Sequence, residues 1–185
     1  RDHVDIFLSP SCFLRNKSIR YGIPEEKIVH LTNFIPEEAF ENYQGEHQGY
    51  FLFLGRLVAI KGVAVLVEAA RSCPEAQIIL AGRAEPGFLK SLQPLPSNME
   101  YVGVKSGAEL RKLLANALAI IVPSLWYENQ PFSILEAFGM GKSVIASDLG
   151  GMTELVVHGE RGLLFTPGSA AELAEAMKNM LSNTK

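Results

Sequence analysis

The stretch Leu118–Gly151, LAIIVPSLWYENQPFSILEAFGMGKSVIASDLGG, contains the pattern that decides the fold. It starts as an apolar run that ends at Pro123, crosses a polar loop, enters a short helix near Pro131 and closes with the β-branched run SVIAS. A strand, a helix and a second strand in this order are typical of a βαβ crossover between neighbouring parallel strands. Because ligands bind at the carboxyl ends of such strands, we expect a crevice there, with Glu128 and Glu136 bracketing the helix entrance.

The composition indicates an ordinary globular chain and argues against a nucleic-acid partner. The 185 residues are 48% hydrophobic, which is enough to bury a sizeable core. The formal net charge is -3, with 17 basic and 20 acidic residues interspersed along the chain. Since the sequence lacks the basic stripe that nucleic acids attract, we expect no nucleic-acid partner.

The cysteines and histidines predict neither disulfides nor a metal site. Cys12 and Cys73 show no C-x-x-C spacing and are interpreted as buried or half-buried free thiols in a reducing compartment. The histidines also lack the spacing of metal ligands; they are His3, His30, His47 and His158.

No apolar run has the length of a membrane span and the N-terminus lacks the layout of a signal peptide, so we expect a cytoplasmic protein. Because Arg1 is not a natural first residue and the chain opens inside what the pattern predicts as a strand, we also expect it to be a piece of a longer protein.

The chain divides into a short first part and a regular second part. In the first part, Val4–Leu8 and Ile28–Leu31 predict strands, and Ser11 is expected to cap a helix between them that ends near Tyr21. The polar, aperiodic stretch Asn33–Gln48 then predicts a linker and a domain boundary.

In the second part, apolar strand patterns alternate with amphipathic helix patterns. The predicted strands are residues 50–54, 76–81, 100–104, 118–123, 143–147 and 162–165. The predicted helices are residues 62–72, 106–116, a short segment after Pro131, 152–157 and 169–181, with caps at Ser106 and Ser169 and a loop-rich stretch at 83–98. This alternation predicts an α/β fold with a doubly wound, Rossmann-like parallel sheet.

The first candidate site is the loop Gly55–Gly62, which follows a predicted strand and opens a predicted helix. Its two cations, Arg56 and Lys61, would meet the positive end of the helix, and this combination suits a diphosphate. The alternative interpretation is that both are solvated loop charges.

The second candidate site is the pair Glu128 and Glu136. Carboxylates only accept hydrogen bonds, so two of them beside a crevice suit sugar hydroxyls, which donate. A glutamate in a first helical turn also commonly complements the helix dipole on a solvated face. Acid and base catalysis of the glycosidase type, which uses two carboxylates, is a further interpretation that the sequence leaves open.

The start of the helix between these glutamates predicts an anion site. Asn129 or Gln130 is expected to cap the helix, with Pro131 in its first turn. The N–H groups of Phe132 and Ser133 would then remain free for an anion.

The third candidate site is the turn Asp148–Gly151, which connects a predicted strand to the helix that starts at Met152. It would have room for a phosphate or a sugar. The alternative is that Gly150 and Gly151 serve backbone geometry only.

Together, these motifs resemble the C-terminal half of a GT-B glycosyltransferase of family 4, the glycosyl transferases group 1. Gly55–Leu57 followed by Lys61–Gly62 resembles the G-R-L-x-x-x-K-G loop of that family, and Glu128–Glu136 resembles its E-x7-E motif. Gly139–Glu154 resembles its A-x-G-x-P-V-I-A-S-x-x-G-G-x-x-E run.

The resemblance implies a role for individual residues. Arg56 and Lys61 would bind the donor diphosphate and take up leaving-group charge, Glu128 would contact the transferred sugar, and Glu136 would bind the ribose hydroxyls. The backbone around Val102–Lys105 would seat the base. The implied catalytic residues are Arg56, Lys61 and Glu128, and the implied donor-binding residues are Gly55, Gly82, Val104, Asn129, Phe132, Ser133 and Glu136. No metal or other cofactor is implied.

The resemblance also implies a domain organisation and a reaction. Residues 1–34 would be the end of a missing N-terminal acceptor domain and hinge, and residues 35–185 a C-terminal nucleotide-sugar-binding domain. The implied reaction is retaining transfer of a hexosyl unit from a UDP-, GDP- or ADP-sugar to an acceptor hydroxyl, in polysaccharide or glycolipid biosynthesis, with peripheral membrane contact of the full-length protein. The fragment alone is expected to be inactive. The alternatives are a nucleotide-sugar epimerase of the same fold and a non-catalytic nucleotide-sugar-binding module.

Overall fold

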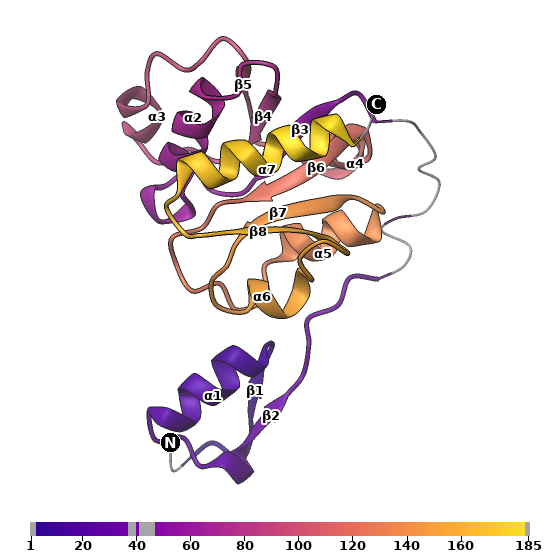
Figure 1. The fold of residues 1–185 in the computed structure, drawn as a ribbon. Helices are drawn as coiled ribbons and strands as arrows, with labels where there is room; N and C mark the ends of the chain where they lie inside the picture. Colours follow the sequence, from indigo (N-terminus) through magenta and orange to yellow (C-terminus); the bar gives the residue numbers. More distant parts are fainter. Residues whose placement is uncertain (1–2, 37–39, 41–46, 184–185) are drawn as a thin grey trace.

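Two separate parallel sheets are present in the computed structural model, which describes residues 3–36, 40 and 47–183 (Figure 1). The smaller sheet pairs β1 (Phe7–Ser9) with β2 (Ile28–His30). The larger sheet has six strands in the order β5-β4-β3-β6-β7-β8, and every neighbouring pair is parallel. In chain order these strands are β3 (Tyr50–Leu54), β4 (Gln77–Ala81), β5 (Met99–Gly103), β6 (Ala117–Val122), β7 (Ser143–Ser147) and β8 (Gly162–Phe165).

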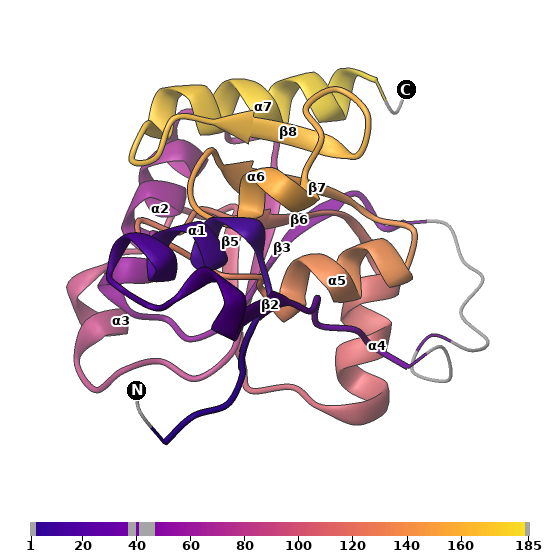
Figure 2. The same cartoon turned by 90° about the horizontal axis from the view of Figure 1, so that it is seen from below.

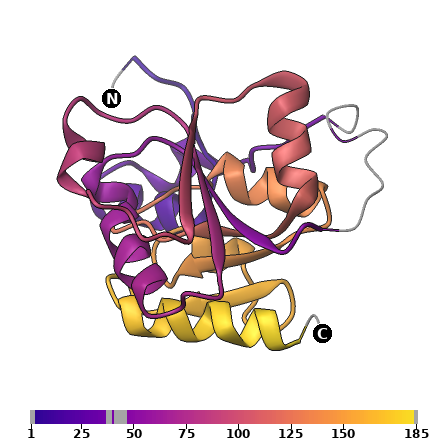
Figure 3. The same cartoon turned by 90° about the horizontal axis from the view of Figure 1, so that it is seen from above.

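Helices cover both faces of the larger sheet, so its strands are apolar on both sides. In β3, Phe51 and Phe53 point into one core and Tyr50 and Leu52 into the other, as the alternation of a strand requires. The first face is covered by α2 (Val63–Arg71) and α7 (Ala170–Ser182), with α3 (Phe88–Ser91) at its edge, and the second by α4 (Gly107–Asn116), α5 (Phe132–Gly139) and α6 (Met152–Leu155) (Figures 2 and 3). This arrangement confirms the predicted doubly wound α/β fold.

The helix starts follow the sequence prediction in part. The side chains of Ser11 and Ser169 accept hydrogen bonds from the N–H groups three residues later, at 3.1 Å and 3.3 Å, which confirms both caps. Ser106 is the N-cap residue of α4, but its side chain forms no capping hydrogen bond, so its predicted capping interaction is wrong. Among the described residues, none of the helices combines the length and the apolar content that a membrane span requires.

The strand order reverses direction between β3 and β6. The chain enters the sheet at β3, moves outward to β5, returns to β6 on the other side of β3 and then moves outward to β8. The helices that follow β3 and β6, α2 and α5, therefore lie on opposite faces of the sheet, and a ligand crevice is expected at the carboxyl edge where the two connections diverge. This position is the topological switch point of the sheet.

The first part of the chain forms a small unit beside this edge. Helix α1 (Cys12–Arg20) and the one-turn helix η1 (Glu25–Lys27) connect β1 to β2. The strand predicted at Val4–Leu8 begins at Phe7 instead. Cys12, predicted to be at least half-buried, is exposed because it belongs to α1, none of whose residues is buried. The predicted linker includes residues 37–39 and 41–46, which lie outside the described residues, and the domain boundary stays a prediction.

Candidate functional site

The loops after β3 and β6 touch at the switch point. The N–H of Leu125 donates to the carbonyl oxygen of Ile60 at 2.8 Å. Gly62, in the left-handed conformation with φ 70°, lies so close to the second loop that a Cβ atom on it would be 1.7 Å from the carbonyl oxygen of Pro123. Only glycine satisfies both the backbone conformation and this approach. The position of Lys61, directly before Gly62, is therefore set by the contact between the loops.

Lys61 and Glu128 form an ion pair across the two loops. The Lys61 Nζ lies 2.5 Å from Glu128 Oε1, and the Ser124 hydroxyl donates to the same oxygen at 2.6 Å. The side chains of Lys61 and Glu128 are 26% and 13% exposed, so both groups are held at the surface of a recess. Among the described residues, no donor contacts Glu128 Oε2. One carboxylate oxygen is thus fixed in place while the other is available to a ligand.

A cleft of about 480 Å³ lies in front of this ion pair. It is lined by residues from the end of β3, the loops after β3 and β6, α5 and the first part of the chain, namely Pro10, Asn33, Leu54, Gly55, Lys61, Glu128, Asn129, Gln130, Pro131, Phe132, Ser133 and Glu136. The structure therefore brings most of the predicted site residues together in one recess, with one cation and two carboxylates in its lining.

The amino end of α5 opens into the cleft. Its N-cap is Pro131, in an extended conformation, and not Asn129 or Gln130 as predicted. Gln130 cannot cap the helix because its side-chain oxygen accepts the N–H of Asn33, and the Asn33 amide donates to the Gln130 carbonyl oxygen at 3.3 Å. The predicted free N–H groups are nevertheless present: those of Phe132 and Ser133 have no acceptor among the described residues. They give the cleft a partial positive charge at this end.

Glu136 lies one turn inside α5 and is partly buried. Burial raises the pKa of its carboxyl above the ordinary value of 4.5, because removing the charged form from water is unfavourable. In the ligand-free protein, ionisation of Glu136 therefore lowers the free energy of unfolding. A ligand that donates hydrogen bonds to its carboxylate would offset that cost.

We expect the variant Glu136→Gln to unfold with a less pH-dependent free energy than the wild type. The folded protein holds the Glu136 proton to a higher pH than the unfolded chain does, so the folded state binds more protons above pH 4.5 and its stability falls as the pH rises through that window. The difference in the free energy of unfolding in favour of the variant, measured by urea titration, should therefore grow as the pH rises above about 4.5. The exposed Glu175→Gln is the control, and an equal pH slope in both variants would contradict this account.

The structure places three predicted site residues outside the cleft. Arg56 is exposed and does not join Lys61 in the lining, which corrects the expected convergence of the two cations. Val104 is 65% exposed at the end of β5. Gly82, with φ 139°, lies against the backbone of Gly55, where a Cβ atom would be 1.8 Å from the Gly55 carbonyl oxygen. The contact of Gly82 with this loop is thus a backbone contact.

The turn after β7 also serves the loop that carries Glu128. The N–H of Gly151 donates to the Glu128 carbonyl oxygen at 2.7 Å, and a Cβ atom on Gly151 would lie 1.6 Å from the carbonyl oxygen of Asn129. A Cβ atom on Gly150 would come within 2.8 Å of the Glu128 carbonyl oxygen. The two glycines thus have a backbone role, because they let the loop after β7 pack closely against the loop after β6.

Sequence reasoning missed the roles of three residues at the site. Ser124 holds Glu128, and the pair Asn33 and Gln130 fixes the loop between Glu128 and α5. Ser124 stands four residues before Glu128 with no motif around it, so the sequence carries no signal for its role. Gln130 is 8% exposed, which the polar composition of its loop does not indicate.

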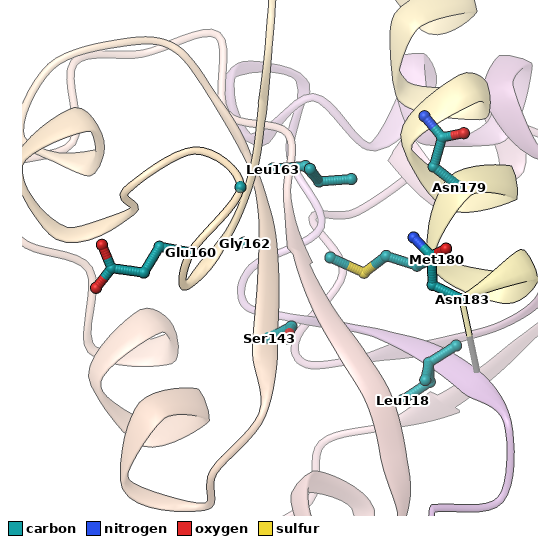
Figure 4. A pocket seen from close by; sticks show the side chains of 9 residues that line it. Leu118, Ser143, Glu160, Gly162, Leu163, Asn179, Met180 and Asn183 are labelled. Carbon is teal, nitrogen blue, oxygen red and sulfur yellow. The ribbon is translucent and has the colours of Figure 1, made fainter.

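A second pocket lies at the opposite edge of the sheet (Figure 4). It has a volume of about 420 Å³ and is lined at the starts of the strands by Leu118, Ser143 and Gly162, and on α7 by Asn179 and Met180. It is remote from the switch point because it lies at the amino ends of these parallel strands. The cleft at Lys61 and Glu128 is therefore the candidate functional site.

Fold and site together define a doubly wound α/β protein with a charged ligand cleft at its topological switch point. The chain belongs to the family of the glycosyl transferases group 1, whose family model matches residues 48–183. The structure matches one half of a GT-B glycosyltransferase: it superimposes on Anabaena Alr3699/HepE, crystallised with UDP, with a TM-score of 0.87 and 24% identity over 98% of this chain and 55% of that one.

Curated relatives agree with this assignment. The amylovoran biosynthesis glycosyltransferase AmsK of Erwinia amylovora is 30% identical over 92% of this chain and 46% of its own length. The alpha-maltose-1-phosphate synthase of Mycolicibacterium smegmatis is 32% identical over 71% of this chain and 38% of its own length. The chain thus spans at most about half the length of these relatives.

Proposed function

We propose that this chain contains the donor site of a retaining, metal-independent transferase that moves a hexosyl unit from a nucleoside-diphosphate sugar to an acceptor hydroxyl. The observation that carries the proposal is that one cleft combines the Lys61 ammonium, the Glu128 and Glu136 carboxylates and the amino end of α5. An ammonium and a helix amino end bind phosphate, and carboxylates accept from sugar hydroxyls. In support, Anabaena HepE was crystallised with UDP and with UDP-glucose.

In this proposal each group has a distinct role. The diphosphate lies between Lys61 and the N–H groups of Phe132 and Ser133, which take up the negative charge of the leaving group without a metal ion. Glu128 presents Oε2 to the transferred sugar while Ser124 and Lys61 hold Oε1. Glu136 accepts from the ribose hydroxyls, and the ligand thereby offsets the cost of its ionisation.

The remaining predicted residues act at the edge of the cleft. Arg56 turns toward the diphosphate from its exposed position, and the backbone at Val104 seats the base. Gly55 and Gly82 leave space for the backbone to approach the donor, and Asn129 contacts the donor from the loop before α5. The nucleotide base and the sugar of the donor are to be identified by comparing nucleotides in a thermal-shift series.

We also propose that residues 1–34 are the end of an N-terminal acceptor domain and that residues 35–185 form the donor domain. Two observations support this division: β1 and β2 form a sheet of their own, and the curated relatives are about twice as long as the chain. On this proposal the chain alone binds donor and transfers nothing. The full-length protein acts in the cytoplasm, in polysaccharide or glycolipid biosynthesis, with peripheral contact to a membrane.

A thermal-shift series with UDP, GDP, ADP and their sugar conjugates tests the donor site. We expect one base to stabilise the chain, by roughly 2.7 kcal/mol at about 100 times its dissociation constant. The ligand-induced shift should be the same with and without EDTA, since the proposed site uses no metal. Absence of a shift with every nucleotide at millimolar concentration would contradict the donor site. Sugar transfer by the 185-residue chain alone would contradict the division into domains. If the chain binds donor but the protein with its acceptor domain restored transfers no sugar, the chain is a binding module.

A further inference from the structure

Three metal-ligating side chains converge where the small unit meets α6. Cys12 is the first residue of α1, His30 is the last residue of β2, and Glu154 lies in α6. One potential ligand atom of each lies within 4.8 Å of the other two. The sequence predicts no metal site, because the cysteines lack C-x-x-C spacing and the histidines lack the spacing of metal ligands. The fold alone brings these three side chains together.

The separation of the sulfur and the nitrogen matches a tetrahedral zinc site. Cys12 Sγ lies 3.4 Å from His30 Nδ1. Zinc is bound at about 2.3 Å by sulfur and about 2.0 Å by imidazole nitrogen, and a tetrahedral angle between these bonds places the two atoms about 3.5 Å apart. The two side chains thus already stand at the distance that a shared zinc ion requires.

The carboxylate of Glu154 is held in position for such a site. The backbone N–H groups of Cys12 and Phe13 donate to its two oxygens, the former at 2.8 Å. A carboxylate has about four lone-pair positions, so these hydrogen bonds leave capacity for a metal bond. Metal-binding carboxylates are commonly oriented by hydrogen bonds of this kind, which fix the ligand before the metal arrives. All three side chains are exposed, so an ion has access from solvent.

We propose that Cys12, His30 and Glu154 bind a zinc ion, with water as the fourth ligand. Binding releases the thiol proton to solvent, since zinc binds the thiolate. The ion would connect α1 and β2 to α6, and α1 already lies close to α6 in Figures 1 and 2. Helix α6 follows Gly151, whose N–H donates a hydrogen bond to the carbonyl oxygen of Glu128. The metal would therefore fix the small unit relative to the loop that carries this glutamate. Its role is structural and is separate from the diphosphate position at Lys61.

Cobalt titration of the metal-free 185-residue chain tests the site. We expect one equivalent of Co²⁺ to produce a thiolate-to-cobalt charge-transfer band, and zinc to displace it. Cys12→Ser should abolish the band. His30→Gln should weaken zinc affinity by at least about 10- to 100-fold, because losing even a residue that only hydrogen-bonds a metal ligand has an effect of that size. His3→Gln, which changes a histidine elsewhere in the small unit, should bind like the wild type. A band that survives Cys12→Ser would overturn the proposal.

Melting temperatures separate this site from a plain hydrogen bond between Cys12 and His30. If the metal connects the small unit to α6, zinc should raise the melting temperature of the wild type and of His3→Gln but not that of the double variant Cys12→Ser/His30→Gln. If the pair only shares a hydrogen bond, the double variant should melt lower than the wild type by the same amount with and without zinc. That second result would overturn the proposal.

Discussion

Replacing Lys61 with alanine is expected to weaken the binding of the cognate nucleoside diphosphate by about 10- to 100-fold. A hydrogen bond to a charged group contributes about 1.5–3 kcal/mol, and Lys61 is the cation in the lining of the cleft. Isothermal titration with the nucleotide identified in the thermal-shift series measures the change. Because the free diphosphate is used, the result does not depend on an acceptor or on turnover.

Two further variants give this prediction its control. Lys112→Ala removes an equal charge from the exposed side of α4 and should bind like the wild type. Glu128→Gln keeps the shape of the side chain but removes a negative charge beside the proposed diphosphate position, so it should bind the free diphosphate as tightly as the wild type or more tightly. If Lys61→Ala binds the nucleotide as well as Lys112→Ala does, Lys61 is not a phosphate ligand.

The variant Gly62→Ala is expected to lower the free energy of unfolding by about 2–5 kcal/mol. The left-handed backbone of a residue with a side chain costs about 1–2 kcal/mol, and forcing an extra methyl group into packed structure typically costs about 1–3 kcal/mol. Both costs apply here because the new Cβ atom would lie 1.7 Å from the carbonyl oxygen of Pro123. Urea unfolding measures the loss, and donor binding should weaken with it as the Lys61 loop moves away from Glu128.

The matched control for this substitution is Gly141→Ala. Gly141 has φ 65°, close to the 70° of Gly62, but a Cβ atom on it would have no neighbour within 4 Å. This variant should therefore show the backbone cost alone, and the difference between the two variants measures the contact between the β3 and β6 loops. Equal destabilisation by both substitutions would mean that the loops do not approach each other as closely as the structure has them.

The sequence by itself determined the elements and their class. The strands at residues 50–54 and 143–147 match their predicted bounds, and the caps at Ser11 and Ser169 form as expected. These features depend on side-chain periodicity and on hydrogen bonds within three or four residues, which a local pattern records. The alternation of strands and helices then restricts the sheet to a doubly wound parallel arrangement, because crossover connections are right-handed. The loop motifs of the candidate site are also local, because each consists of residues close together in the sequence.

The tertiary structure alone decided which of these residues meet. Lys61 and Glu128 are 67 positions apart, and Cys12 and Glu154 are 142 apart, so their contacts depend on the strand order and on which loops face the switch point. Whether a charge such as Arg56 faces the cleft or solvent, and how far Glu136 is buried, also depends on the packing of neighbouring elements. Local sequence patterns do not indicate such distant contacts, because the free energy that selects them comes from packing whole helices and loops against the sheet.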